Sequence, residues 1–307
     1  MNIDLLKWAF SRKARRRIKE NIKLIMTLVV KNEEDIIEQN IRFHCAMGVD
    51  GVIVISHNST DNTNVILEKL KSEGLVLEII EKTTPNHQHS IWVNEMVKIA
   101  KNKYGADWII NADADEFYYS NSLNLKKSIL QCDGASSLWV DSIFLFPDDK
   151  KDFLNSTYFV ARPFQKFEAD MLDLFNDKLY EDFIGSQGCT KVIHKTKGFV
   201  SICDGNHDVK MRPNKKFQSA DIRLYHYHIR NYIGMEQKVA RWFESIFLLP
   251  EGQGGHMKYM VNLYKTGKLR EEYDRKYGEK MRNFLIEHGV VVTDPSVRNF
   301  LVHRGII

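Results

Sequence analysis

The chain has few cysteines and lacks the spacing of cysteine motifs. Only four occur among 307 residues: Cys45, Cys132, Cys189 and Cys203. Since no two of them form a C-x-x-C pair, the sequence indicates neither a zinc site nor a disulfide framework. Free, scattered cysteines are typical of a reducing compartment, so we expect a cytoplasmic location.

Long apolar runs are also missing. No stretch approaches the 18 consecutive apolar residues that predict a transmembrane helix. Lys7 and Arg12 interrupt the apolar residues near the N-terminus, so a signal peptide is not predicted. Hydrophobic residues make up 43% and charged residues 27% of the chain, as in soluble globular proteins. The length fits one large domain, alone or with an extension.

Positive charge is concentrated at the N-terminus. Residues 1–23 contain eight Lys or Arg and two acidic residues, a net charge of +6, whereas the whole chain carries +4. The remainder is therefore slightly acidic, and no basic groove with interleaved aromatics predicts a nucleic-acid partner. Because apolar residues accompany the basic ones, residues 1–20 could lie on an anionic membrane, which would make the protein peripheral on the inner membrane face. A solvated helix or frayed terminus is the alternative.

Short apolar runs alternate with helical patterns in the first third of the chain. Four runs rich in β-branched residues predict strands that are buried on both faces: 24–30, 52–55, 76–80 and 107–112. Helical spacing predicts three intervening helices: 32–48, 61–72 and 89–103. This alternation predicts an α/β fold, with a mostly parallel sheet and helices on both faces.

The alternation weakens after residue 120. We expect further strands at 135–146, 191–194, 199–202 and 221–229. From Tyr232 onward the pattern predicts helices, mainly over 235–249 and 258–288. The sequence therefore predicts three parts, which are a basic arm (1–21), an α/β domain (22–230) and a C-terminal helical extension (231–307).

Three carboxylates directly follow the strand predicted at 107–112. They are Asp113, Asp115 and Glu116. Like charges this close resist joint ionisation unless a cation neutralises them, and oxygen ligands suit Mg²⁺ or Mn²⁺. This turn and the polar segments 31–33 and 57–61 all follow predicted strands, where open α/β sheets bind ligands. A solvated acidic turn is the alternative.

Four segments in this order resemble family 2 glycosyltransferases of the GT-A fold, and among them a bacterial subgroup. Residues 29–35 are similar to its "KNE-D" motif, 58–63 to "N-S-T-D", 108–117 to "D-x-D-E-F" and 225–230 to "H-x-x-x-R". The likeness spans about residues 22–245. The sequence departs from the family at His57, where Asp is usual, and at Asn62, where Gly is usual.

The resemblance implies a GT-A (Rossmann-like) domain that transfers a sugar, of the hexosyltransferase type, from a nucleotide donor. A UDP-sugar is the expected donor, and the acceptor is a hydroxyl of a glycan or glycolipid in bacterial surface polysaccharide or lipopolysaccharide assembly. Inversion at the sugar and a Mn²⁺ or Mg²⁺ cofactor are implied as well. The implied metal ligands are Asp115, Asp113 and His226. The implied donor-binding residues are Lys31, Asn32, Glu33, Asn58, Asp61, Asp113 and Arg230.

An inverting transfer also needs a general base and an acceptor site. Candidate bases are Asp182, Glu181 and Asp141, and candidate acceptor contacts are Glu116, Trp139 and His207. Several of these residue types have structural alternatives. Asp61 could cap a helix, Glu116 could cap a turn, and Trp139 could fill the core; His226 could bond to the backbone, and Arg230 could form a salt bridge.

Two other functions fit parts of the pattern. Phosphatases of the HAD type also place D-x-D after an apolar strand, which leaves a metal-dependent phosphohydrolase open. However, Phe117 stands where those enzymes have Thr or Val, and Glu116 adds a carboxylate they do not need. The basic arm and His57 instead suit a non-catalytic membrane-surface binding protein with a degenerate GT-A domain.

Overall fold

The structure is a computed structural model that describes residues 22–84, 88–161, 190–246 and 255–307. The described chain divides into two compact units. The first comprises 22–84, 88–141, 190–224 and 303–307, and the second comprises 142–161, 225–246 and 255–302. The basic arm predicted at 1–21, with its membrane contact, lies outside the described residues.

The first unit begins with the alternating elements that the sequence predicts. In chain order these are β1 (Leu24–Val30), α2 (Ile37–Ala46), β2 (Val52–His57), α3 (Thr63–Ser72), β3 (Val76–Lys82), α4 (His89–Asn102) and β4 (Trp108–Ala112). The unit continues with β5 (Glu116–Ser120), α5 (Leu125–Gln131), β6 (Ser137–Val140), β9 (Lys191–Lys195), β10 (Phe199–Ile202), the short 3-10 helix η3 (Asp204–Asn206), β11 (Val209–Met211) and β12 (Lys216–Gln218). Strand β13 (Ile222–His226) begins in the first unit and ends in the second.

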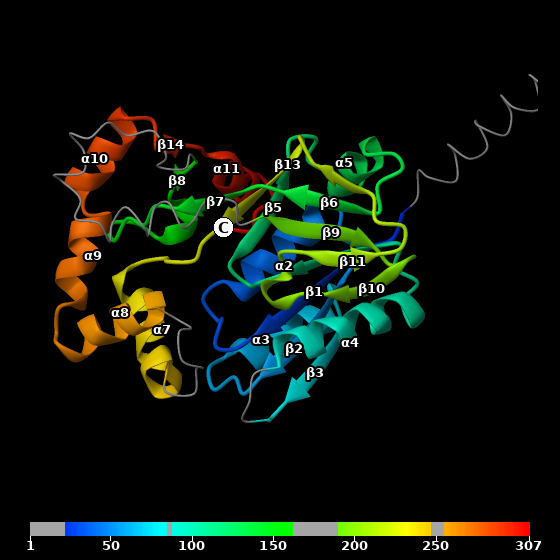
Figure 1. Cartoon of the computed structure of the whole chain (residues 1–307), viewed down its shortest axis with the longest axis horizontal. Coiled ribbons are helices and arrows are strands. Elements are labelled where there is room, and N and C mark those ends of the chain that lie inside the picture. Colours follow the sequence, from blue (N-terminus) through cyan, green and yellow to red (C-terminus); the bar gives the residue numbers. More distant parts are fainter. Residues whose placement is uncertain (1–21, 85–87, 162–189, 247–254) are drawn as a thin grey trace, which may run out of the picture. The chain divides into compact units, whose positions relative to one another are not determined.

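A seven-stranded sheet forms the centre of the first unit, and Figure 1 labels its strands β1, β2, β3, β6 and β9. The strand order is β12-β6-β9-β4-β1-β2-β3. Strand β9 runs antiparallel to β4 and β6, and the other neighbouring pairs are parallel. The predicted α/β fold with a mostly parallel sheet is confirmed. Because the strands are parallel, the carboxyl ends of β1, β2, β4 and β6 lie at one edge, together with the beginning of β9.

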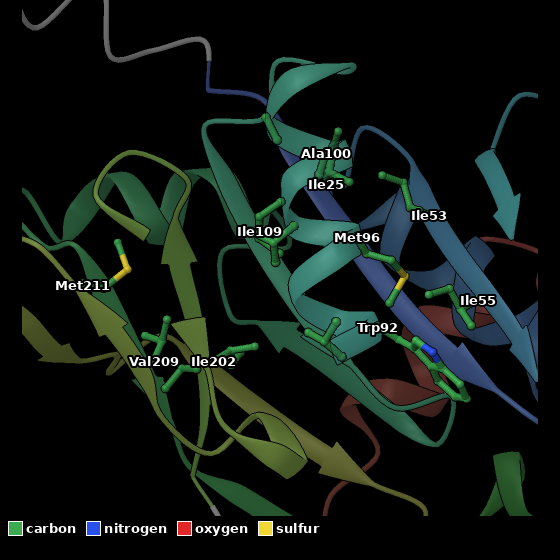
Figure 2. Close-up of a cluster of buried hydrophobic side chains, with 14 residues drawn as sticks. Ile25, Ile53, Ile55, Trp92, Met96, Ala100, Ile109, Ile202, Val209 and Met211 are labelled. Atoms are coloured by element: carbon green, nitrogen blue, oxygen red, sulfur yellow. The ribbon is translucent and has the colours of Figure 1, made fainter. Parts of the chain in front are cut away.

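Helix α4 covers one face of this sheet. Its Trp92 and Met96 pack with Ile25, Ile53 and Ile109 from β1, β2 and β4, as Figure 2 shows. Side chains alternate across a strand, so the apolar runs that predicted these strands also supply residues to the other face. Right-handed crossovers place α2 and α3 on that other face. The prediction of helices on both faces is therefore confirmed.

Two buried side chains of α2 hold the segment that follows β4. The amide nitrogen of Asn40 donates hydrogen bonds to the carbonyl oxygens of Ala114 (2.9 Å) and Glu116 (2.8 Å). His44 Nε2 accepts the N–H of Tyr118 (3.0 Å), so its proton is on Nδ1, which lies 2.8 Å from the Asn40 carbonyl oxygen. Only neutral imidazole makes both bonds, and burial lowers the pKa of His44 to about 4.

The second unit contains a small antiparallel sheet and several helices. Strands β7 (Ser142–Leu145), β8 (Tyr158–Val160) and β14 (Val291–Thr293) belong to this unit and are neighbours, in the order β14-β8-β7, within a five-stranded sheet. Its helices are the short 3-10 helix η1 (Phe153–Asn155), α7 (Tyr232–Ser245), α8 (Gly255–Lys265), α9 (Leu269–Tyr277), α10 (Glu279–Glu287) and α11 (Ser296–His303). None of the helices within the described ranges has the length and apolar character needed to cross a membrane.

The second unit differs from the expected C-terminal extension of helices alone. Strand β14 pairs with β8, so residues 291–293 join a sheet with residues 158–160, and the units do not follow a boundary at residue 230. The helix expected at 258–288 is three helices, which break near Gly267 (φ 68°) and Gly278. The strand expected at 135–146 is two, β6 and β7, which are separated at Asp141.

The core under α4 yields a stability prediction. Met96 is fully buried between α4 and the sheet, whereas Ile91 on the same helix is 62% exposed. Met96→Ala leaves a cavity, and we expect it to lower the free energy of unfolding by about 2–5 kcal/mol in urea titrations. Ile91→Ala is the matched control, with an expected change within about 0.5 kcal/mol. Equal losses for both variants would contradict the packing.

The buried histidines predict acid sensitivity. Burial lowers the pKa of His44, and likewise that of His194, to about 4, below the value near 6.5 in an unfolded chain. The unfolded state therefore binds more protons between these values, and stability is lost as the pH falls from about 6.5 to 4. Each histidine contributes a slope of at most about 1.4 kcal/mol per pH unit.

In urea titrations at pH 7, 6 and 5, we expect the free energy of unfolding of His44→Gln to fall less steeply with decreasing pH than that of the unmodified protein. The difference in slope is the contribution of one buried histidine. The exposed His303→Gln serves as the control and should keep the slope of the unmodified protein. Parallel pH profiles for all three proteins would show that His44 is not buried in its neutral form.

Candidate functional site

The acidic turn, residues 113–116, connects β4 to β5 at the carboxyl edge of the sheet. The N–H of Asp113 donates to Glu116 Oε2, and the N–H of Glu116 donates to the Asp113 carbonyl oxygen, both at 3.1 Å. Glu116 is fully buried, while Asp113 and Asp115 are half-buried. These two hydrogen bonds close the turn, which favours the capping alternative for Glu116.

A buried lysine from β9 contacts this turn. Lys191 is 4% exposed, and its Nζ lies 3.0 Å from Asp113 Oδ2 and 2.9 Å from Glu116 Oε1. Burial alone lowers the pKa of Lys191, but the charges of Glu116 and Asp113 outweigh it and hold that pKa above its ordinary value. On the other side of Asp113, Oδ1 lies 3.9 Å from His89 Nε2, at the start of α4.

Sequence reasoning missed Lys191 as a site residue. The signal was present, because a charged residue opens a strand whose next residues, Val192 and Ile193, are apolar and fully buried. A lysine at such a position requires a charged partner nearby. The partner lies 78 residues away in sequence, so only the pairing of β9 with β4 reveals it.

The loops after β1 and β2 bind each other. Asn32 Oδ1 accepts the N–H of Thr60 at 2.7 Å. The carboxylate of Asp61 accepts the N–H groups of Thr63 (3.0 Å) and Glu34 (3.1 Å). Both oxygens of Asp61 thus bond to backbone, which favours the capping alternative over a donor contact. The two loops with candidate donor-binding residues therefore lie together, at the carboxyl ends of neighbouring parallel strands.

Both loops use left-handed backbone at an asparagine. Asn32 has φ 55° and Asn58 has φ 51°, a conformation that asparagine tolerates better than most residues. Lys31 and Asn58 are exposed, and the N–H of Glu33 is held by the hydroxyl of Thr63 at 2.9 Å. The candidate donor residues of these loops therefore lie at one edge on a cross-linked scaffold.

His57 is buried at the end of β2, where the resembling family has an acid. Its Nε2 lies 2.8 Å from the carbonyl oxygen of Thr84, and its ring centroid lies 4.8 Å from that of Trp92. The imidazole therefore connects β2 to the segment after β3 and packs on α4.

The candidate bases have different positions. Asp141 directly follows β6, so it lies at the same edge as the acidic turn, and its side chain is exposed. Asp182 and Glu181 lie outside the described residues.

Two acceptor candidates lie on the first unit near β6 and β9. Trp139 is 36% exposed, with Lys216 Nζ 5.1 Å from its ring centroid, so it does not fill the core as the alternative proposed. Lys216 also pairs with Asp208, the neighbour of His207. His207 Nδ1 lies 3.0 Å from the carbonyl oxygen of Thr190, which precedes Lys191. Lys216 therefore connects the strand of Trp139 to the loop of His207.

His226 and Arg230 belong to the second unit and are half-buried there. The His226 ring lies 5.2 Å from that of Phe144 and 5.6 Å from that of His228. The Arg230 guanidinium lies 5.7 Å from the centre of the Phe153 ring. These are packing contacts within the second unit.

The acidic turn has a donor set that fits a hard divalent cation in part. No group of three or more His, Cys, Asp or Glu side chains that could hold a metal occurs in the described part of the chain. Asp113 and Asp115 offer two half-buried carboxylates, and Mg²⁺ typically combines one or two carboxylates with phosphate oxygens of a substrate. The residues therefore fit a cation that binds together with a diphosphate.

Comparisons with solved structures give distant similarities. Residues 1–349 of Staphylococcus aureus TarS in complex with UDP-GlcNAc are 13% identical, over 92% of this chain and 80% of that one, with a TM-score of 0.43. Mycobacterium tuberculosis glucosyl-3-phosphoglycerate synthase, in complex with Mn²⁺, UDP and glucosyl-3-phosphoglycerate, is 13% identical over 77% of this chain and 84% of that one, with a TM-score of 0.39. No curated protein sequence matches the chain.

The family is shown by a sequence profile. The profile of Glycosyltransferase family 92 matches residues 27–282, from β1 into α10. The motif resemblance to family 2 thus predicted the enzyme class, glycosyltransferase, but not the family. Since the matched residues make up most of the molecule and include the acidic turn with its flanking strands, the chain belongs to glycosyltransferase family 92.

Proposed function

We propose that the protein is a metal-dependent glycosyltransferase that moves a hexose from a UDP-sugar to an acceptor hydroxyl with inversion. The observation that carries the proposal is the position of Asp113 and Asp115, at the carboxyl edge of a parallel sheet in a family 92 chain. Ligands of open α/β sheets bind at this edge. The neighbouring loops, 31–34 and 58–63, supply polar groups for the nucleoside.

The chemical need at this edge is to stabilise negative charge. Transfer breaks the bond between the sugar and the diphosphate, and the electron pair leaves with the nucleoside diphosphate. Asp115 and Asp113 would hold Mn²⁺ or Mg²⁺, which would supply Lewis-acid stabilisation of that charge. The chain's own contribution is a turn whose backbone is fixed by Glu116 and Asn40, so that its carboxylates need little reorganisation when the donor binds.

The acceptor hydroxyl must lose a proton to a base on the face opposite the leaving group. Asp141 is the candidate base within the described residues, because it is exposed at the end of β6. The exposed ring of Trp139 offers a flat apolar face on which a sugar can stack, and His207 offers a polar contact. An acceptor glycan or glycolipid of cell-surface polysaccharide or lipopolysaccharide assembly, reached with the basic arm on the membrane, completes the proposal.

The first test removes the proposed metal ligand. Asp115→Asn keeps the size of the side chain, so we expect a small change in melting temperature. Loss of charge stabilisation of the leaving group should lower kcat by about 10²–10³-fold, followed as UDP release from a panel of UDP-sugars with Mn²⁺. Asp133→Asn, at an exposed carboxylate between α5 and β6, is the control and should retain full turnover. Undiminished turnover by Asp115→Asn at the same Mn²⁺ concentration would refute the assigned role.

A second test compares ligands by thermal shift. A ligand that binds only the folded state adds about 2.7 kcal/mol of stability at 100 times its Kd. We expect UDP and Mn²⁺ together to raise the melting temperature, and either one alone to raise it much less. No response to any nucleotide would favour the non-catalytic binding protein, and hydrolysis of a simple phosphate ester would favour the phosphohydrolase.

A further inference from the structure

The ion pairs of Lys191 are unusual for their burial. Lys191 is 4% exposed and Glu116 is fully buried, so two charges have been removed from water next to the proposed donor site. Buried ion pairs contribute little to stability in general, because the cost of desolvation offsets their attraction. Replacing both members of such a pair by apolar side chains is often neutral or stabilising. The location of the pair at the ligand-binding edge therefore points to a role in the site.

The position of Lys191 is set by the sheet and not by a loop. It is the first residue of β9, where it pairs with Val140 of β6, and β9 also pairs with β4 through Ile193 and Ile110. The ladder with β4 places the beginning of β9 beside the end of β4, from which the acidic turn starts. Two strand pairings thus fix the position of the ammonium group beside the turn. Residues on strands are held more rigidly than residues on loops.

The contacts of Lys191 fix Asp113 in one orientation. Glu116 Oε1 lies 2.9 Å from Lys191 Nζ, and Glu116 Oε2 accepts the N–H of Asp113. The same Nζ lies 3.0 Å from Asp113 Oδ2. Both the backbone and one carboxylate oxygen of Asp113 are therefore tied to the buried pair. The lysine occupies one side of Oδ2, so Oδ1 is the oxygen of Asp113 that is less engaged and better placed to meet a ligand.

The charge of Lys191 also affects cation binding. The turn carries three carboxylates, and Lys191 brings one positive charge into contact with two of them. A divalent cation that arrives alone meets a repelling ammonium group and only part of the negative charge of the turn. A cation that arrives with a diphosphate brings the missing negative charge with it.

We propose that Lys191 is a positioning residue that orients Asp113 through one oxygen and keeps the acidic turn from binding a divalent cation until a nucleoside diphosphate is present. The proposal rests on the proposed function, because it assigns Lys191 to the donor site of that reaction. Lys191 makes metal binding conditional on the donor, and it sets the orientation of the carboxylate that the donor complex meets.

The test measures Mn²⁺ binding directly, by the electron paramagnetic resonance signal of free Mn²⁺, without and with UDP. Without UDP, we expect Lys191→Met to bind Mn²⁺ at least about tenfold more tightly than the unmodified protein, because the repelling charge is removed. With UDP, the advantage should disappear, and the KM for the donor should rise several-fold because Asp113 is no longer fixed. Lys191→Arg retains the charge and should behave like the unmodified protein.

Lys195→Met is the matched control, because Lys195 ends the same strand and lies over the ring of Trp108, away from the acidic turn. It should leave Mn²⁺ binding unchanged. If Lys191→Met does not fold, the double variant Lys191→Met/Glu116→Gln is compared with Glu116→Gln, since it leaves no buried unpaired carboxylate at position 116. Without UDP, the double variant is expected to bind Mn²⁺ more tightly than Glu116→Gln, by the same factor as for the single variant.

Unchanged Mn²⁺ affinity without UDP in a folded variant that lacks Lys191 would overturn the proposal. Failure of both variants to fold while Lys191→Arg folds would also overturn it, because the lysine would then serve stability. Failure of the proposed function has a different signature. The unmodified protein would then bind no UDP with Mn²⁺, whatever the variants show in metal alone.

Discussion

The pairing of β4 with β1 on one side and with β9 on the other is the constraint on which the rest of the structure depends. The parallel ladder with β1 brings the ends of both strands to one edge. The antiparallel ladder with β9 starts β9 at that edge, with Lys191 as its first residue. The backbone hydrogen bonds of the sheet therefore bring the Lys191 ammonium group next to the carboxylates of the acidic turn. The ion pairs between them are a consequence of the strand pairing.

The acidic turn is held from two directions. From α2, Asn40 donates to two carbonyl oxygens of the turn, and His44 accepts an N–H from β5. From β9, Lys191 contacts Asp113 and Glu116. The side chains of Asn40, His44, Glu116 and Lys191 are buried, where a polar group without a partner is costly, so each bond supports the others. The turn is ordered before a ligand arrives, and binding then requires little further ordering.

Sequence reasoning predicted the elements whose signal is local. β1, β2 and β4 are continuous apolar runs, and the acidic turn is visible because its charges adjoin such a run. What it missed depends on pairing between distant segments. Lys191 is an ordinary lysine until β9 is placed beside β4, and β14 is a three-residue strand that exists because β8 offers an edge. Trp139 gave no local signal of exposure, because burial depends on what covers its strand.

The difference between the motif resemblance and the family has the same physical origin. The carboxylate pair after β4 and the polar loops after β1 and β2 lie at the edge where open α/β sheets bind their ligands. Such motifs reflect the chemistry at the edge of the sheet. Families that share this chemistry also share the motifs, so the motifs predict a class of enzyme. The buried residues next to this edge, such as His57 and Lys191, depend on the packing of one particular chain. Where the resembling family has an acid, His57 is buried, bonds to the carbonyl oxygen of Thr84 and packs against Trp92, so its environment is one that the motif alone does not describe.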